Sequence, residues 1–304
     1  MSSKVFNGNK IKRNKKRMTP LMVILCVILV LYTISLFLPL VWGFFTSLKG
    51  KYELRHNMFG LPEEWLWENY LKAFNSFKVP VEIEEGWATV YLEQMLLYSV
   101  IYAVGCAVIQ AVVTCVMAYV TAKFKHFVLS KVIYSTVLIV MMLPIVGSLP
   151  SEIALAQSLG IYNTIWGMFI LKFNFLGMYY LVFHATFRGI PKDFSEAAYI
   201  DGASEWAVML KIIFPMVKGT LSVIILLNFI GYWNDYQTPM LFMPRYPTMS
   251  YGLYAYTNSL DQDILTDIPG QLTGCMLLML PILVVFLIFR DKLIGNISMG
   301  GLKE

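Results

Sequence analysis

The chain has 304 residues, of which 58% are hydrophobic and only 14% are charged, with a formal net charge of +5 and a mean hydropathy of +0.63. Soluble domains carry about 25% charged residues, so this composition excludes a soluble globular protein and indicates an integral membrane protein. The cysteines lie in long apolar stretches and give neither a disulfide framework nor a metal-site spacing: Cys26, Cys106, Cys115 and Cys275.

Six apolar windows are long enough to cross about 30 Å of hydrocarbon as helices. They cover residues 21–45, 95–121, 132–149, 161–187, 220–242 and 271–289. The sequence therefore predicts an all-α, polytopic bundle of six transmembrane helices. It forms a single transmembrane domain over residues 21–304, preceded by a basic tail at residues 1–20.

The tail carries seven Lys and Arg residues and no acid. Basic loops stay cytoplasmic, and threading six spans from a cytoplasmic tail places most of the 24 basic residues on that side. An uncleaved apolar span follows, so the tail is interpreted as a topology anchor and not as a signal peptide or a nucleic-acid patch. Both termini are expected to be cytoplasmic.

The first long outer loop, residues 47–94, combines acids with Trp65, Trp67 and Trp87. These tryptophans are typical of anchors at the membrane interface. Alternatively, the acidic loop is a docking surface for another protein. The sequence leaves both interpretations open.

The segment at residues 189–218 lies on the expected cytoplasmic side and interrupts the apolar pattern. Asp193 and Glu196 predict a capping box at the start of a short helix, and Gly202 predicts a turn with positive φ. Ser204 is placed to cap a second, amphipathic helix that Pro215 would end. The physical pattern alone also fits an interfacial hairpin that merely connects two spans.

The details resemble the EAA loop of ATP-binding cassette (ABC) importer permeases, in which E-A-A, a glycine and a terminal I-x-L-P stand at fixed spacing. The matching residues are Glu196, Ala197, Ala198, Gly202, Ile212 and Pro215, with Phe214 in place of the usual Leu. Further similar strings are "PLVWGFFTSLKG", "MMLPIVGSLP", "YWNDYQTPM" and the terminal "GNISMGGLKE". Together they resemble the type I permeases for carbohydrate uptake in bacteria, the group of the second maltose permease subunit.

This resemblance implies that the first helix of the EAA loop (residues 189–218) is a coupling helix, seated in a groove of a separate ATPase subunit. It implies as partners a second homologous permease in a heterodimer, two ABC ATPase subunits that bind ATP and Mg, an extracytoplasmic solute-binding protein and membrane lipid, but no nucleic acid. No phosphate-binding G-x-x-x-x-G-K-[ST] string occurs, so we expect neither enzymatic activity nor a cofactor or metal in this chain. The residues expected to serve coupling are Glu196, Ala197, Ala198, Tyr199, Asp201, Gly202 and Ser204.

Polar side chains inside spans are costly and usually face a cavity or the bundle interior. The candidates for a solute pathway are Lys172, Asn174, Asn228, Trp233, Asn234 and Asp235. Aromatic faces with amides and carboxylates suit a sugar, but Trp233, Asn234 and Asp235 fit an interhelical hydrogen-bond cluster equally well. Alternatively, the aliphatic part of the Lys172 side chain could extend along the helix so that its charged amine reaches the membrane interface.

The sequence therefore predicts the transmembrane subunit of a binding-protein-dependent ABC importer for a carbohydrate, in which ATP hydrolysis by partners drives alternating access in the bacterial plasma membrane. The alternative is a secondary active transporter of a small solute, which calls for inverted repeats and paired intramembrane charges that are not evident. A membrane enzyme is disfavoured because the three histidines are scattered. The sequence does not identify the solute.

Overall fold

The computed structural model describes residues 19–143, 147–259, 261, 264 and 266–299, and side chains up to residue 289. Most of the basic tail and the end of the glycine-rich C-terminal string therefore lie outside the described residues. The helices are α1 Pro20–Ser47, η1 Glu53–Arg55, α2 Glu68–Ser76, α3 Leu92–Lys123, α4 Val128–Met142, α5 Leu149–Ser158, α6 Ile165–Leu171, α7 Met178–Arg188, α8 Asp193–Ile200, α9 Glu205–Val208, η2 Met209–Ile213, α10 Phe214–Asn234, α11 Gln237–Phe242, α12 Met249–Thr257 and α14 Ile268–Met299.

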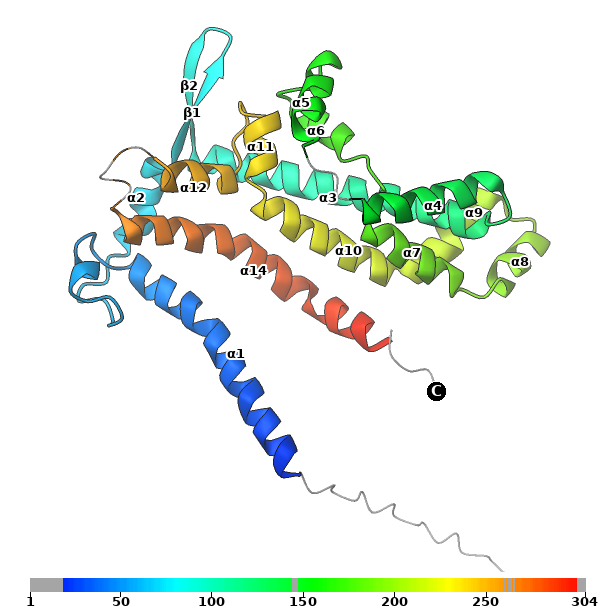
Figure 1. Cartoon of the computed structure of the whole chain (residues 1–304), viewed down its shortest axis with the longest axis horizontal. Helices are drawn as coiled ribbons and strands as arrows, with labels where there is room; N and C mark the ends of the chain where they lie inside the picture. Colours follow the sequence, from blue (N-terminus) through cyan, green and yellow to red (C-terminus); the bar gives the residue numbers. More distant parts are fainter. Residues whose placement is uncertain (1–18, 144–146, 260, 262–263, 265, 300–304) are drawn as a thin grey trace, which may run out of the picture.

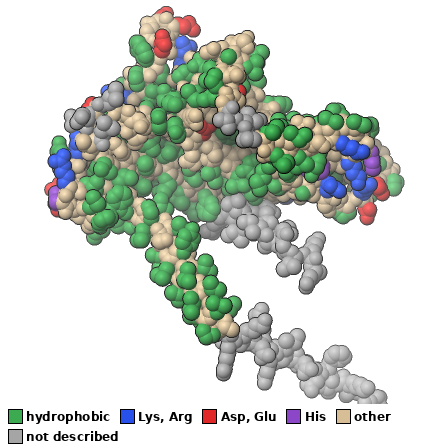
Figure 2. Space-filling view, in the orientation of Figure 1, with side chains coloured by type: hydrophobic (Ala, Val, Ile, Leu, Met, Phe, Trp, Pro, Cys, Tyr) green, Lys and Arg blue, Asp and Glu red, His purple; other side chains and the backbone are tan. Residues whose placement is uncertain are grey.

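The long helices α3, α10 and α14 run side by side and span the molecule (Figure 1). One end of this bundle carries a β-hairpin with α2, and we call it the hairpin end; the other carries α8 and α9, and we call it the α8 end (Figure 1). The apolar surface along the bundle gives way to Lys, Arg and His side chains at the α8 end (Figure 2). This distribution fits a bundle whose sides face lipid and whose ends face water.

In the described part of the chain, four helices are long and apolar enough to cross a membrane. They are Pro20–Ser47, Leu92–Lys123, the continuous stretch Glu205–Asn234, and Ile268–Phe289. The predicted all-α bundle is thus confirmed, but two of the six predicted windows are not single long helices. The window at 132–149 covers residues 132–142 of the 15-residue α4 and the first residue of α5, with residues 144–146 outside the described part.

The window at 161–187 is divided into α6 and α7 by a non-helical segment at residues 172–177. Within it, Asn174 Oδ1 accepts a hydrogen bond from Leu176 N at 2.7 Å. This local bond competes with the helical hydrogen-bond pattern and is the physical reason for the break. An apolar window alone does not reveal it.

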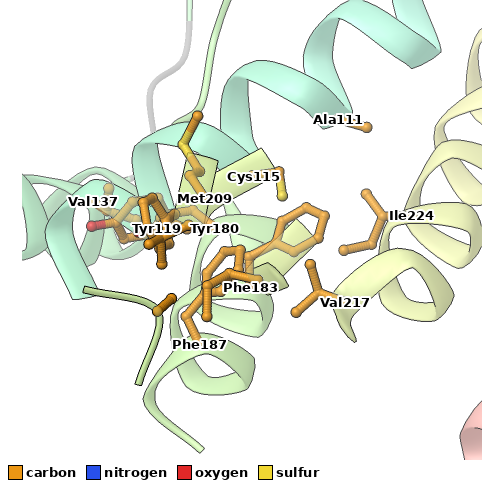
Figure 3. Close-up of a cluster of buried hydrophobic side chains, with 14 residues drawn as sticks. Ala111, Cys115, Tyr119, Val137, Tyr180, Phe183, Phe187, Met209, Val217 and Ile224 are labelled. Carbon is orange, nitrogen blue, oxygen red and sulfur yellow. The ribbon is translucent and has the colours of Figure 1, made fainter. Parts of the chain in front are cut away.

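The centre of the bundle is packed through small residues on α3. Ala103, Ala107, Ala111, Cys115 and Ala118 are each no more than 1% exposed. In lipid, close packing of helices depends on such small residues because there is little hydrophobic drive for association. They let α7 and α10 approach, and aromatic side chains such as Phe183 and Phe187 complete a core near the α8 end (Figure 3).

The second helix of the EAA loop does not end at Pro215, contrary to the prediction. A π-helical turn, Met209–Ile213, joins α9 to α10, and Pro215 sits in the first turn of α10. Proline lacks an N–H and crowds the preceding turn, and a π-turn widens the helix there. The second arm of the EAA loop is therefore continuous with a membrane-crossing helix.

Among the described residues, helix α1 contacts the bundle near its C-terminal end, where it packs against α14 (Figure 1). A Cβ on Gly43 would lie 3.2 Å from Met276 Cε, so glycine permits the close approach of the two helices. Thr273 Oγ1 and Asn69 Nδ2 both donate hydrogen bonds to Ser47 O. The rest of α1 is exposed along its length.

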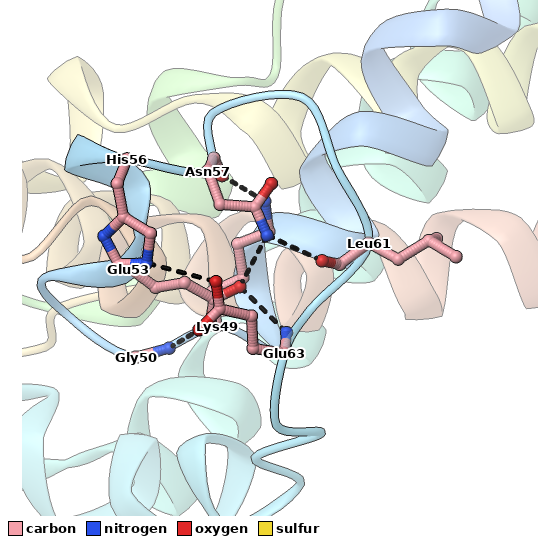
Figure 4. A network of polar contacts seen from close by, with 7 residues as sticks. All are labelled: Lys49, Gly50, Glu53, His56, Asn57, Leu61 and Glu63. Carbon is pink, nitrogen blue, oxygen red and sulfur yellow. Dashed lines mark hydrogen bonds and ion pairs between the residues drawn. The ribbon is translucent and has the colours of Figure 1, made fainter.

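The loop after α1 is held by buried polar groups (Figure 4). Lys49 is 1% exposed, and its Nζ donates to Asn57 O at 2.5 Å. Glu53 Oε1 accepts from Asn57 Nδ2 at 3.0 Å and from Glu63 N at 2.9 Å. The loop is therefore ordered by specific hydrogen bonds.

The segment between α2 and α3 contains two antiparallel strands, β1 Lys78–Ile83 and β2 Gly86–Tyr91, which were not predicted from the sequence. Val79 pairs with Val90, and both are buried. Apolar residues that alternate with other residues are typical of a half-buried strand. The valines of "KVPVEI" follow this pattern, so the sequence already contained the signal for β1. Trp87 on the hairpin is 74% exposed.

Candidate functional site

The EAA loop folds as a helical elbow. Helix α8 ends before Gly202, whose φ is +79°, and Ser204 Oγ accepts a hydrogen bond from Ala207 N at 3.3 Å to cap α9. The predicted glycine turn and serine cap are thus present. The predicted capping box is absent, because the N-cap position of α8 is Lys192 and no side chain caps it.

The two alanines of the E-A-A string face different ways. Ala198 is 8% exposed and belongs to the same core cluster as Phe187 and Val208. Its small side chain therefore lets α8 lie close to its own bundle, and this contradicts the expectation that both alanines approach a partner. Ala197 is exposed, and Ile200 at the end of α8 is 86% exposed.

The hydroxyl of Tyr199 connects α8 to the bundle through hydrogen bonds. Its hydroxyl donates to Glu205 Oε2 at 2.8 Å, and Lys123 Nζ from the end of α3 donates to both groups. Lys123 also lies 5.1 Å from the centre of the Tyr199 ring. Sequence reasoning missed Lys123 and Glu205, because nothing local indicates that the end of α3 meets the elbow.

The remaining expected coupling residues are exposed. They are Glu196 and Asp201 with Gly202 and Ser204. The outward side of α8 therefore presents the carboxylates of Glu196 and Asp201 beside the large apolar side chain of Ile200. The inward side of α8 fixes the elbow to α3 and α7.

A second group of polar side chains lies where two helices break. Lys172 follows α6 at the α6–α7 break, and its Nζ lies 5.3 Å from the centre of the Tyr232 ring. The Tyr232 hydroxyl donates to Gln110 Oε1 on α3 at 2.7 Å. The break thus places a cation against an aromatic ring of α10, a favourable cation–π geometry.

Asp235 marks the other break, where α10 ends and α11 begins. Its Oδ2 accepts from the Tyr102 hydroxyl at 3.0 Å and its Oδ1 accepts from Thr238 N at 3.0 Å. Tyr102 and Tyr232 pack edge to face at 5.7 Å. We call Tyr102, Gln110, Lys172, Tyr232 and Asp235 the polar cluster.

The polar cluster lies within the depth of the bundle. Tyr102 is ten residues beyond the start of α3, which corresponds to about 15 Å along the helix from the hairpin end. Non-helical backbone at membrane depth is tolerated where it is buried in protein or lines a water-filled cavity. Two such breaks, with lysine, aspartate and tyrosines between them, make this the best candidate for a solute contact.

The other predicted pathway residues lie elsewhere. Asn174 bonds within its own break, and Asn234 Nδ2 donates to Ile230 O of its own helix. Asn228 is buried, and its Nδ2 has no partner among the described residues. Trp233 is 1% exposed, and its Nε1 donates to Leu278 O of α14 at 3.0 Å, which favours the interhelical alternative for this residue.

Replacing Trp233 by phenylalanine is expected to destabilise the bundle by about 2 kcal/mol, through a smaller ring and the loss of the hydrogen bond to Leu278 O. Thermal unfolding in detergent measures the effect. Trp87→Phe is the matched control, because Trp87 is 74% exposed. Equal stability of the two variants would contradict the packing role of Trp233.

Comparison with known proteins places these features in context. Residues 114–298 match the model of a family described as "Binding-protein-dependent transport system inner membrane component". The "Diacetylchitobiose uptake system permease protein NgcG" of Streptomyces coelicolor is 26% identical over 276 residues, covering 90% of this chain and 86% of that protein. The "Multiple sugar-binding transport system permease protein MsmG" of Streptococcus mutans is 22% identical over 280 residues, covering 91% and 95%.

Solved structures share the fold. A chain from the crystal structure of a bacterial ABC transporter involved in the import of the acidic polysaccharide alginate superposes with a TM-score of 0.71 at 20% identity, covering 88% of this chain and 95% of that chain. The expected importer-permease fold is thereby confirmed.

Proposed function

The chain belongs to the family of binding-protein-dependent transport system inner membrane components, and on that premise we propose that it is the membrane-spanning subunit of a carbohydrate importer driven by a separate ATPase. The observation that carries this proposal is the elbow of α8 and α9. Its inner side is fixed to the bundle, its outer side is exposed, and its second arm continues without interruption into α10.

The elbow suits a mechanical link. A partner that binds the exposed side of α8 moves α9, and α9 is continuous with α10 through the π-turn. The far end of α10 carries Tyr232 and is followed by Asp235 of the polar cluster. Movement at the α8 end is therefore delivered to the proposed solute contact, as alternating access requires.

The polar cluster supports a carbohydrate as the solute. Tyrosine rings pack against the C–H faces of sugars, while Lys172, Gln110 and Asp235 offer donors and acceptors to hydroxyl groups. The relatives named for diacetylchitobiose and multiple-sugar transport support the same class. The other predicted pathway residues are not part of this proposal, because none of them is hydrogen-bonded to the polar cluster among the described residues: Asn174, Asn228, Trp233 and Asn234.

The remaining parts of the proposed assembly are a second homologous permease, two ATPase subunits that bind ATP and Mg, and an extracytoplasmic solute-binding protein. In this proposal the α8 end faces the cytoplasm, because segments rich in lysine and arginine favour that side of the membrane. Residues 21–304 are one permease domain, and the basic tail at residues 1–20 is cytoplasmic.

The tagged chain, extracted from membranes, is expected to retain a co-expressed ABC ATPase. The Ile200→Glu variant is expected to reduce the amount of retained ATPase at least about tenfold. The reason is that placing a carboxylate in an apolar contact costs more than about 1.4 kcal/mol. Quantitative pull-down measures this. Phe59→Glu is the control, because Phe59 is 83% exposed in the outer loop. Undiminished retention by Ile200→Glu would argue against α8 as the contact.

A further inference from the structure

A cavity of about 350 Å³ lies at the α8 end, between the ends of α3 and α7 and the start of α8. Its floor is largely apolar: Phe187 and Ile213 are each no more than 8% exposed. Tyr119, 7% exposed, also lines it, and the Tyr119 hydroxyl is buried without a hydrogen-bond partner in the described part of the chain. A buried, unpaired hydroxyl beside a cavity indicates a missing polar partner.

The rim of the cavity is cationic. Its lining includes one carboxylate, that of Glu196, and four lysine or arginine side chains: Lys123, Lys125, Arg188 and Lys192. Glu205 neutralises Lys123, and the other three cations make no ion pair with the described residues. The rim therefore carries an excess of unpaired positive charge over an apolar base, at the end of a bundle of membrane-crossing helices.

We propose that this cavity binds the phosphate group of an anionic phospholipid from the leaflet on the α8 side, with the apolar floor accepting the start of its glyceryl and acyl portion. Basic pockets between helices at the membrane surface are suited to such headgroups. A phosphate here would contact Arg188 at the end of α7 and Lys192 before α8 at once. The lipid would thereby link the elbow to the bundle, independently of which solute is carried.

The test uses the full chain in nanodiscs of phosphatidylcholine containing a small fraction of phosphatidylglycerol, with lipid retention read by native mass spectrometry. The double variant Arg188→Gln with Lys192→Gln is expected to bind phosphatidylglycerol about 25-fold more weakly, since each basic group near an anionic headgroup contributes about a factor of five. Lys211→Gln with Lys218→Gln is the matched control. It removes the same charge from exposed positions at the same end that do not line the cavity.

Three further outcomes decide the proposal. Arg188→Lys with Lys192→Arg keeps both charges and is expected to retain the lipid, which separates binding from misfolding. Equal loss in the Lys211 and Lys218 control would show nonspecific attraction and overturn the site. Inorganic phosphate titrated into nanodiscs of phosphatidylcholine alone is expected not to bind; binding that the Arg188 and Lys192 variant abolishes would assign the cavity to a soluble anion and overturn the lipid source.

Discussion

Gly202→Val is expected to reduce ATP-driven uptake at least about tenfold while the chain still inserts into the membrane. The φ of Gly202 is +79°, a conformation that costs a β-branched residue about 1–3 kcal/mol. The chain is expected to relieve this strain by shifting α8 relative to α9. Nothing lies within 4 Å of a Cβ placed on Gly202, so the effect is conformational and not a steric clash. Uptake and ATP hydrolysis are measured in proteoliposomes that contain the complete importer.

Gly202→Asn is the matched control, because asparagine tolerates positive φ far better than valine does. It is expected to retain most of the uptake. If both variants lose uptake equally, the side chain at this position blocks a contact. If both transport normally, the elbow does not transmit movement.

Asp235→Ala is expected to have a comparably large effect on uptake, at the other end of α10. The substitution removes the acceptor for the Tyr102 hydroxyl and the acceptor for Thr238 N. Tyr102 is fully buried, so its unpaired hydroxyl alone costs about 1–3 kcal/mol. The expected result is a fall in uptake of about 5- to 150-fold, the range that corresponds to that loss of free energy.

Two variants separate structure from solute contact in the polar cluster. Asp235→Asn keeps an acceptor and is expected to preserve the fold while removing the charge. Lys172→Met keeps the length of the stem but removes the cation near the Tyr232 ring. If the cluster contacts the solute, both variants raise the solute concentration needed for half-maximal uptake, with unchanged thermal stability. Unchanged uptake in both would remove the cluster from the pathway.

Much of the fold was predictable because lipid imposes simple rules. Long apolar windows predicted α1, α3, α10 and α14, and Gly202 and Ser204 predicted the elbow, since positive φ and helix capping are set by one or two residues. The break at Asn174 was missed, because a side-chain hydrogen bond that divides a helix does not change the average hydropathy of the window that contains it. The π-turn was missed because proline normally ends a helix.

The candidate sites were predictable only in part, because they depend on contacts between distant segments. Lys172 and Asp235 were identified as costly charges within apolar windows. Tyr102 and Tyr232 were not, because tyrosine is common in membrane helices and their role appears only where α3, α6 and α10 meet. The inward position of Ala198 likewise depends on how α8 packs, which a repeating pattern on one helix does not determine.

The most direct test of the account compares solute uptake into liposomes containing the purified chain alone with uptake into liposomes that also contain the second permease, the ATPase, ATP and the loaded binding protein. The account predicts accumulation only in the complete system, and its loss when Gly202 is replaced by valine. Solute accumulation by the chain alone, driven by an ion gradient without nucleotide, would contradict it.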